Sequence, residues 1–479
     1  MRIPLKPDSN APGAPSPDGC SRRRWMQTTA LATAGMLIVP NALALPADGH
    51  ALLLQHRPQP PRAVSSDDAY GLLRDGILAS LNLVPTVGGF LSYIGALVIP
   101  AAGESPEATW RRYTDQKISE SLFASVRADL VGLSDVVSLY IRTVASGDAK
   151  AVQAQSIAAN SLMTALLPRF QIPAEALELL PLFAIGATLH LALLRDIALT
   201  GKAVGFEDAY VQFVAEELTT RIASYTRHAD LCQRRALEKV RDDNPTGSEP
   251  DRRNQPMSAM LEKRTSLYLT VLDQRDTWYA FDSRKHPGRT EVYLTREVFT
   301  PVIGWWDSAS TPPTELPAWP APAGSLDQIS AWSDGRPDAR YLTGFSCRYS
   351  DGNETKTGTL KGEVQTRDLG AAFLTVDQVR SHVSAAMGGI EVRSQPGGRQ
   401  TLLGREPGRH DRTVTSAVDQ HRLSSVRAIG RGKDHVDGMV SGCVLGFQLV
   451  HQARRGPSVE VLDRVRPHLP RSLLAWLTS

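Results

Sequence analysis

The stretch from Leu179 to Leu194 is the segment whose residue types restrict its chemistry most. Its 16 residues, LLPLFAIGATLHLALL, include no Asp, Glu, Lys or Arg. A helix of this sequence is apolar on every side, so it is either the buried centre of a bundle or a membrane span. At about 1.5 Å per residue it covers roughly 24 Å, short of a hydrocarbon core of about 30 Å. We therefore predict a buried core helix with the capacity to enter lipid.

Motifs for other kinds of chemistry are missing from the sequence. It holds no HExxH, GxSxG or P-loop pattern and no GxGxxG after a strand-like run, so we expect no enzyme and no cofactor. None of the four cysteines belongs to a CxxC pair, so we expect no metal site. The formal net charge of +3 provides no basic field for nucleic acid. Cys347 and Cys443 fall in strand-like segments, where a disulfide and two free buried thiols are both open interpretations.

The N-terminus has the features of an export signal. Arg22 and Arg23 begin a positive segment, residues 28–40 are mostly apolar, and Ala42 and Ala44 form an A-x-A cleavage site. The arginine pair before an aromatic residue resembles a twin-arginine signal, which a receptor recognises. We therefore expect an exported protein, secreted or periplasmic. The alternative is an anchored N-terminal helix.

The apolar pattern changes once along the chain, from helical to strand-like. A run of helices followed by a run of strands favours two separate domains. We predict an all-α helical bundle, with about seven helices round the central apolar helix, followed by an all-β prism. The expected segments are a signal peptide (1–44), a flexible leader (45–66), the helical domain (67–290), a junction strand and Pro-rich linker (291–324), the β-prism (325–455) and a C-terminal tail (456–479).

Periodicity and Gly/Pro breaks also divide the helical domain. The expected helical segments are two apolar pieces in 67–100, a long amphipathic helix in 106–146, an amphipathic helix in 150–170, the apolar helix in 173–201, a charged helix in 205–242 and a last helix in 256–278.

Several sequence blocks point beyond periodicity to a family. Within the apolar helix, Leu180–Ala184 (LPLFA), Leu189–Leu191 (LHL) and Leu193–Asp196 (LLRD) follow one another at fixed spacing. A further block, Asp282–Thr300, follows the last helix. In order and spacing these blocks resemble the central helix and the junction of the three-domain Cry insecticidal crystal toxins, the delta-endotoxins. Thr188 stands where that family commonly has Asn.

The resemblance implies a role for two neighbouring helices. In that family the fourth and fifth helices insert into lipid as a hairpin and oligomerise into a pore, which here corresponds to 155–170 and 174–200. This chain would then be a monomer in solution and a homo-oligomer in the target-cell membrane. The membrane-inserting residues would be Leu180, Pro181, Phe183, Ala187, Leu189, His190, Leu191 and Leu194. Candidates for a polar lumen are Ser156, Asn160, Ser161 and Thr164, for which a solvated bundle face is the alternative. His190 is either a satisfied core residue or a pH switch.

The C-terminal strands resemble jacalin-like β-prism lectins through the run from Leu342 to Gly358 and the ending SGCVLGFQLV. This resemblance implies a glycan or glycoprotein receptor. Asp434, His435 and Asp437 form a possible ligand loop, or else an ordinary solvated turn. Trp319 beside the linker either stacks on sugars or packs between domains.

Taken together, these features predict a pore-forming toxin of the delta-endotoxin type, which inserts a helical hairpin after its β domain binds a receptor or glycan. The alternative is an exported carbohydrate-binding lectin or adhesin whose helical domain is only structural.

Overall fold

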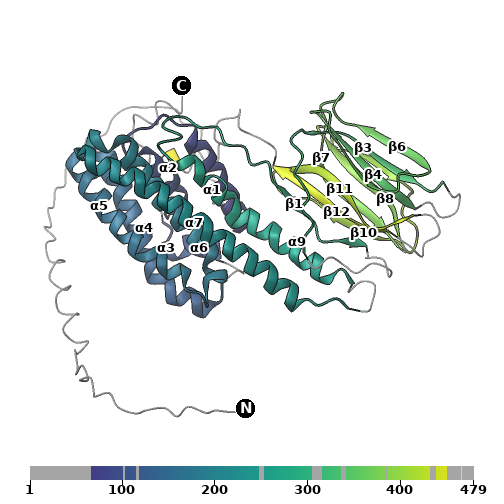
Figure 1. The fold of residues 1–479 in the computed structure, drawn as a ribbon, viewed down its shortest axis with the longest axis horizontal. Coiled ribbons are helices and arrows are strands. Elements are labelled where there is room, and N and C mark those ends of the chain that lie inside the picture. Colours follow the sequence, from purple (N-terminus) through teal and green to yellow (C-terminus); the bar gives the residue numbers. More distant parts are fainter. Residues whose placement is uncertain are drawn as a thin grey trace, which may run out of the picture. The chain divides into compact units, whose positions relative to one another are not determined.

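The structure is a computed structural model that describes residues 66–100, 103–114, 118–247, 253–304, 315–335, 341–384, 386–431, 438–449 and 465–466. Helices come first along the chain and strands follow, as the sequence predicts (Figure 1). Some predicted functional residues lie outside the described residues. They are the signal residues Arg22, Arg23, Ala42 and Ala44 and the loop residues Asp434, His435 and Asp437.

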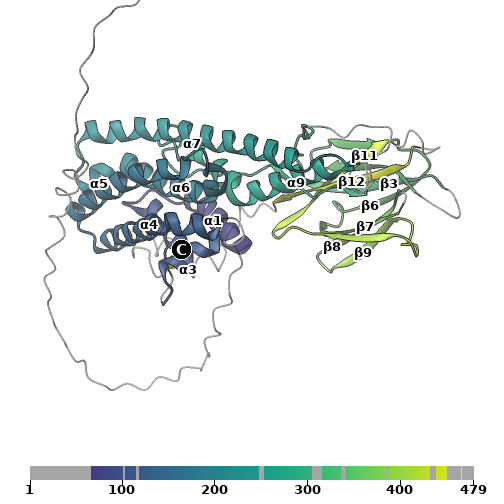
Figure 2. The same cartoon turned by 90° about the horizontal axis from the view of Figure 1, so that it is seen from below.

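The helical part is a bundle with one shared apolar core, and α6 runs through it (Figures 1 and 2). Its elements are α1 (Ser66–Leu81), α2 (Gly89–Val98), α3 (Pro106–Thr114), α4 (Glu120–Ser146), α5 (Ala149–Leu166), the 3-10 turn η1 (Leu167–Gln171), α6 (Ala176–Thr200), η2 (Gly201–Val204), α7 (Asp208–Asp243), α9 (Gln255–Leu267), the π turn η3 (Tyr268–Leu272), α10 (Asp273–Arg275) and η4 (Trp278–Phe281).

Two of the predicted helices are not continuous. The expected helix in 106–146 is divided into α3 and α4, because Ser119 starts a new helix by accepting a hydrogen bond from the Leu122 N–H at 3.4 Å. The expected helix in 256–278 is interrupted by the π turn η3 and then by α10. Apolar periodicity continues across both interruptions, so it could not locate them.

The turn between α4 and α5 sets the direction of the candidate hairpin. Gly147 ends α4 in the left-handed conformation, with φ 73°, which glycine adopts without a Cβ penalty. The Asp148 carboxylate then accepts hydrogen bonds from the N–H groups of Lys150 and Ala151, at 3.0 and 3.1 Å, and caps α5. This local chemistry returns the chain directly alongside α4.

The strands form three four-stranded antiparallel sheets, the arrangement predicted as a β-prism. The strand orders are β1-β12-β11 with β2 also on β12, β10-β7-β8-β9 and β5-β4-β3-β6. The strands are β1 (Glu297–Phe299), β2 (Ile303–Gly304), β3 (Leu326–Ser333), β4 (Leu342–Tyr349), β5 (Glu354–Gly358), β6 (Glu363–Asp368), β7 (Thr375–Val383), β8 (Met387–Gln395), β9 (Arg399–Gly404), β10 (Arg412–Ser416), β11 (His421–Arg431) and β12 (Val440–Leu449).

The junction segment belongs to this β domain. In β1, Val298 pairs with Phe447, and in β2, Ile303 pairs with Cys443. Side chains from all three sheets enclose a second apolar core, which contains Cys347 and Cys443 as buried free thiols. Of the two interpretations left open for these cysteines, the structure has the free thiols.

The last long helix of the bundle packs on the first sheet of the prism (Figures 1 and 2). Met257 and Leu261 of α9 form an apolar cluster with Phe299, Ile429 and Val444. Trp319 joins this cluster, with its ring centroid 5.2 Å from that of Phe299. Of its two predicted roles, Trp319 therefore has the packing role between domains.

Candidate membrane-insertion hairpin and its contacts

The apolar helix α6 is enclosed on all sides by the bundle. Every residue from Leu179 to Ile197 is buried. Its 25 residues correspond to about 37 Å, so the helix is longer than the apolar run suggested and exceeds a hydrocarbon core of about 30 Å. Within the described residues, it is the one helix long and apolar enough to cross a membrane. All eight predicted membrane-inserting residues are buried: Leu180, Pro181, Phe183, Ala187, Leu189, His190, Leu191 and Leu194.

His190 is a fully paired core residue in this structure. Its Nε2 lies 2.8 Å from the side-chain oxygen of Asn160 in α5, which can only accept, so Nε2 carries the proton. Its Nδ1 then accepts a hydrogen bond from the hydroxyl of Tyr225 in α7, at 2.7 Å. Burial lowers the pKa of His190 to about 3, so the imidazole is neutral. Both neighbouring helices are tied to α6 at this point.

Thr188 links α6 to the end of the bundle. Its hydroxyl accepts a hydrogen bond from the Trp278 indole N–H at 2.9 Å and donates one to the Gln274 side-chain oxygen at 3.2 Å. The Gln274 amide donates in turn to the Thr270 carbonyl oxygen at 2.7 Å. The residue that departs from the family pattern therefore has a complete set of partners here.

Arg195 and Asp196 fix the C-terminal end of α6 to two other segments. The Arg195 guanidinium donates to the carbonyl oxygens of Ala280 and Phe281, at 3.2 and 3.0 Å. The Asp196 carboxylate accepts from the N–H groups of Phe90 and Leu91 in the first turn of α2, at 3.1 and 2.8 Å. Burial nevertheless raises the pKa of Asp196 to about 7. These contacts are structural, because they attach the end of α6 to η4 and α2.

The four polar candidates in α5 do not share one face. Ser156 is buried, and its hydroxyl donates to the Val152 carbonyl oxygen at 2.7 Å. Asn160 faces His190, whereas Ser161 and Thr164 are exposed. The solvated-face interpretation is therefore wrong for Ser156 and Asn160, because α5 turns these two side chains towards its helical neighbours.

The exposed face of α5 is unusual for a surface helix because it carries no charge. No Asp, Glu, Lys or Arg occurs between Lys150 and Arg169. Solvent-exposed residues in this interval are Ala154, Ile157, Ala158, Ser161, Thr164, Ala165 and Pro168. Surface helices of soluble proteins usually place charged residues on this side. This uncharged interval can be seen in the sequence, but the amphipathic pattern of the segment indicated only the four individual polar residues.

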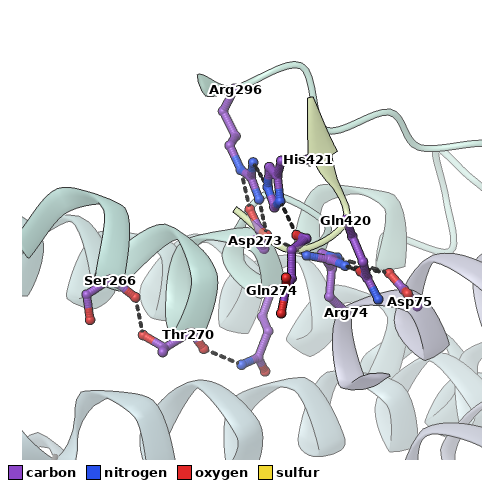
Figure 3. Close-up of polar contacts among 10 residues, drawn as sticks. Arg74, Asp75, Ser266, Thr270, Asp273, Gln274, Arg296, Gln420 and His421 are labelled. Atoms are coloured by element: carbon purple, nitrogen blue, oxygen red, sulfur yellow. Dashed lines mark hydrogen bonds and ion pairs between the residues drawn. The ribbon is translucent and has the colours of Figure 1, made fainter. Parts of the chain in front are cut away.

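A buried polar cluster connects the bundle to the β domain, and the sequence did not predict it (Figure 3). Arg296, which precedes β1, forms a two-pronged ion pair with Asp273 of α10; its Nε lies 2.8 Å from Oδ1. Arg74 of α1 lies 3.8 Å from the same carboxylate and donates a hydrogen bond to the Gln420 side-chain oxygen. Figure 3 shows these side chains converging from α1, α10 and the start of β11.

His421 completes this cluster as a neutral acceptor. Its Nε2 lies 2.6 Å from Nη1 of Arg296, and a guanidinium can only donate. The Nδ1 proton is then directed at the Asp419 carbonyl oxygen, 2.6 Å away. Burial, followed by the charge of Arg296, lowers the pKa of His421 to about 3. A proton on Nε2 would face the Arg296 donor and the positive charges of Arg296, Arg74 and Arg422.

Comparison with known proteins defines the class of the helical domain. Residues 76–282 match the family described as delta endotoxin, N-terminal domain. This part of the chain is therefore similar to delta-endotoxin N-terminal domains, in agreement with the resemblance of its sequence blocks. The curated relatives that match the chain are described as pesticidal crystal proteins.

Particular relatives extend this result. Pesticidal crystal protein Cry1Ab from Bacillus thuringiensis subsp. kurstaki is 29% identical over 240 residues, which cover 48% of this chain and 20% of the relative. The chain therefore matches about a fifth of the length of that relative. The solved structures of Cry7Ca1 and Cry8Ea1 from Bacillus thuringiensis align at TM-scores of 0.61 and 0.58, each with 20% identity. The alignment with Cry7Ca1 covers 80% of this chain and 75% of the Cry7Ca1 chain, and the alignment with Cry8Ea1 covers 81% and 74%. The likeness of fold therefore includes the β domain.

Proposed function

We propose that this protein is a pore-forming toxin in which α5, η1 and α6 insert into the target membrane as a helical hairpin. The observation that carries the proposal is a pair of neighbouring helices with long uncharged intervals. In α6 the interval Leu179–Leu194 is buried and holds no Asp, Glu, Lys or Arg, and α5 with η1 has an exposed face yet is free of ionisable side chains from 151 to 168. A helical hairpin satisfies its own backbone hydrogen bonds in lipid, where no water can do so.

The uncharged intervals of both helices come close to the thickness of a hydrocarbon core, about 30 Å. The uncharged interval of α5 and η1 contains 18 residues, about 27 Å, with Lys150 and Arg169 at its ends. The uncharged interval of α6 ends at Glu178 and Arg195. Charges at the two ends and none between them match a bilayer, because a charge at its centre costs about 2.5–3.5 kcal/mol or more. Membrane insertion accounts for the lack of charge on the exposed α5 face.

Further parts of the proposal rest on the sequence and the family. The protein is exported through its N-terminal signal and is a monomer until it meets lipid, where it oligomerises. The β domain contacts a receptor or glycan on the target cell. Ser161 and Thr164, exposed in the soluble fold, line the polar side of the inserted hairpin.

Leakage of a trapped dye from phosphatidylcholine liposomes tests the proposal. Ala187→Asp is a poor probe because Ala187 is fully buried, so the charge would unfold the bundle. Ile157→Asp is better, since Ile157 is 47% exposed in α5 and the soluble fold tolerates a charge there. Leu139→Asp is the matched control, because Leu139 is 45% exposed in α4, outside the hairpin.

We expect Ile157→Asp to lower the leakage rate at least roughly tenfold, from the cost of a carboxylate within the bilayer. Leu139→Asp should leave the rate within about twofold. Equal leakage by both variants would show that α5 does not enter lipid. Absence of leakage by the unmodified protein, with tight glycan binding, would favour the lectin alternative.

A further inference from the structure

A cavity of about 380 Å³ lies at one end of the β domain. All three sheets contribute to its walls, through the start of β3, the β6–β7 turn, the start of β11 and the end of β12. Its volume is within the range of small-molecule sites, which is about 300–1,000 Å³.

Phe373 borders the cavity with an exposed side chain and an unusual backbone conformation. Its side chain is 90% exposed, and its backbone has φ 52°, in the left-handed region that bulky residues avoid. The turn is held by hydrogen bonds from the Phe373 N–H to the Gly370 carbonyl oxygen at 3.1 Å and from the Leu374 N–H to that of Leu369 at 2.8 Å. Such strain is unfavourable for the folded state and collects at functional sites. An exposed phenyl ring at a strained position therefore indicates contact with a ligand.

The polar side chains of the cavity wall define the charge of that ligand. Asp327 and Arg422 are the only charged residues in the wall, and their formal charges cancel. Arg422 is held by a hydrogen bond from its Nη1 to the His421 carbonyl oxygen at 2.8 Å. The Gln448 amide is fixed by two hydrogen bonds, to the carbonyl oxygens of Thr295 and Pro322, each at 2.8 Å. A neutral ligand that both donates and accepts hydrogen bonds suits this wall.

We infer that this cavity binds a neutral saccharide of one or two rings. Sugar hydroxyls can donate to Asp327 and accept from Arg422, while the C–H face of a pyranose ring packs on the phenyl ring of Phe373. The inference rests on the proposed function only in assigning target recognition to the β domain. Saccharide binding itself is independent of membrane insertion, so the two can be tested apart.

Isothermal titration calorimetry of the full chain provides the test. The probes are methyl α-mannoside, methyl β-galactoside, N-acetylglucosamine and N-acetylgalactosamine, with glucose 6-phosphate as the anionic comparison. We expect at least one neutral sugar to bind with a millimolar or lower Kd, and glucose 6-phosphate to bind at least roughly tenfold more weakly. Failure of all four neutral sugars, or preference for the anionic one, would overturn the inference.

Phe373→Gly separates ligand contact from folding. Glycine accepts the positive φ, so the melting temperature should stay equal or rise, while sugar affinity falls at least roughly tenfold. Two control variants change one property each. Leu360→Gly relieves another positive φ, 49°, at a residue that does not line the cavity. Phe213→Ala removes a different exposed aromatic ring, which is 59% exposed in α7. Both controls should keep the affinity of the unmodified protein. Unchanged sugar binding by Phe373→Gly would sink the inference.

Liposome leakage distinguishes the two failures. Phosphatidylcholine vesicles carry no sugar, so Phe373→Gly should leak dye from them at the rate of the unmodified protein. Sugar binding without leakage would remove the pore proposal and keep the saccharide site, whereas leakage without sugar binding would do the reverse.

Discussion

The substitution His421→Gln should reduce the loss of stability that this protein suffers in mild acid. Glutamine can still accept a hydrogen bond from Arg296 through its side-chain oxygen, but it cannot take up a proton. His421 faces Arg296 directly and also lies near Arg74 and Arg422, so a positive imidazole has no favourable place in the folded state. The variant therefore keeps the contact and removes only the titration.

The magnitude follows from the two pKa values of His421. The pKa is about 3 in the folded protein against the ordinary value of 6.5, so unfolding takes up a proton between those limits. The stability contributed by neutral His421 is present above pH 6.5 and is lost as the pH falls towards 3. At pH 5 the loss amounts to about 2 kcal/mol. His190 has a pKa of about 3 as well and adds a loss of similar size within the bundle.

Urea unfolding at pH 7.5 and pH 5.0 measures this difference. Carboxylates titrate equally in both proteins, so the comparison of the two pH dependences isolates His421. We expect His421→Gln to lose about 2 kcal/mol less than the unmodified protein between the two pH values. His410→Gln, at an exposed histidine, is the matched control. If His421→Gln and the unmodified protein lose the same stability, the neutral-acceptor assignment is incorrect.

Two other substitutions probe the polar contacts of the fold. Thr188→Val removes the acceptor of the Trp278 indole and the donor to Gln274, so the free energy of unfolding should fall by about 1–3 kcal/mol. A fall of less than about 0.5 kcal/mol, measured by urea unfolding, would contradict this expectation. Arg296→Met leaves the buried Asp273 carboxylate without its two-pronged partner, which should lower stability by about 3–5 kcal/mol, measured by the same method. A variant as stable as the unmodified protein would mean that Arg74 alone is a sufficient partner for Asp273.

The parts of the fold that the sequence predicted are those with a strong local signal. The apolar run of α6 and the alternation in the strands of the β domain are repeated patterns, and burial follows from them. The break between α3 and α4 was missed because Ser119 acts through a single capping contact while the apolar spacing continues on both sides. The π turn η3 was missed for a similar reason.

The site was predicted in part. The eight inserting candidates in α6 followed from composition and from the resemblance, whereas the inward position of Ser156 and Asn160 required the arrangement of neighbouring helices. The polar cluster at the junction could not be predicted, because Arg74 and Gln420 are 346 residues apart in the sequence. Arg74 appears in the sequence as one more charged residue of an amphipathic helix.

The polar contacts of α6 bear on how fast the helix can leave the bundle. Thr188 and Arg195 bond to the end of the bundle, in α10 and η4, whereas His190 bonds to α5 and α7 and Asp196 bonds to α2. Loosening any one neighbour leaves α6 attached to the others, so partial opening gains little. If α6 inserts as proposed, its departure from the bundle would be a single high-barrier event, and the soluble form would persist through kinetic stability even where the inserted state has the lower free energy.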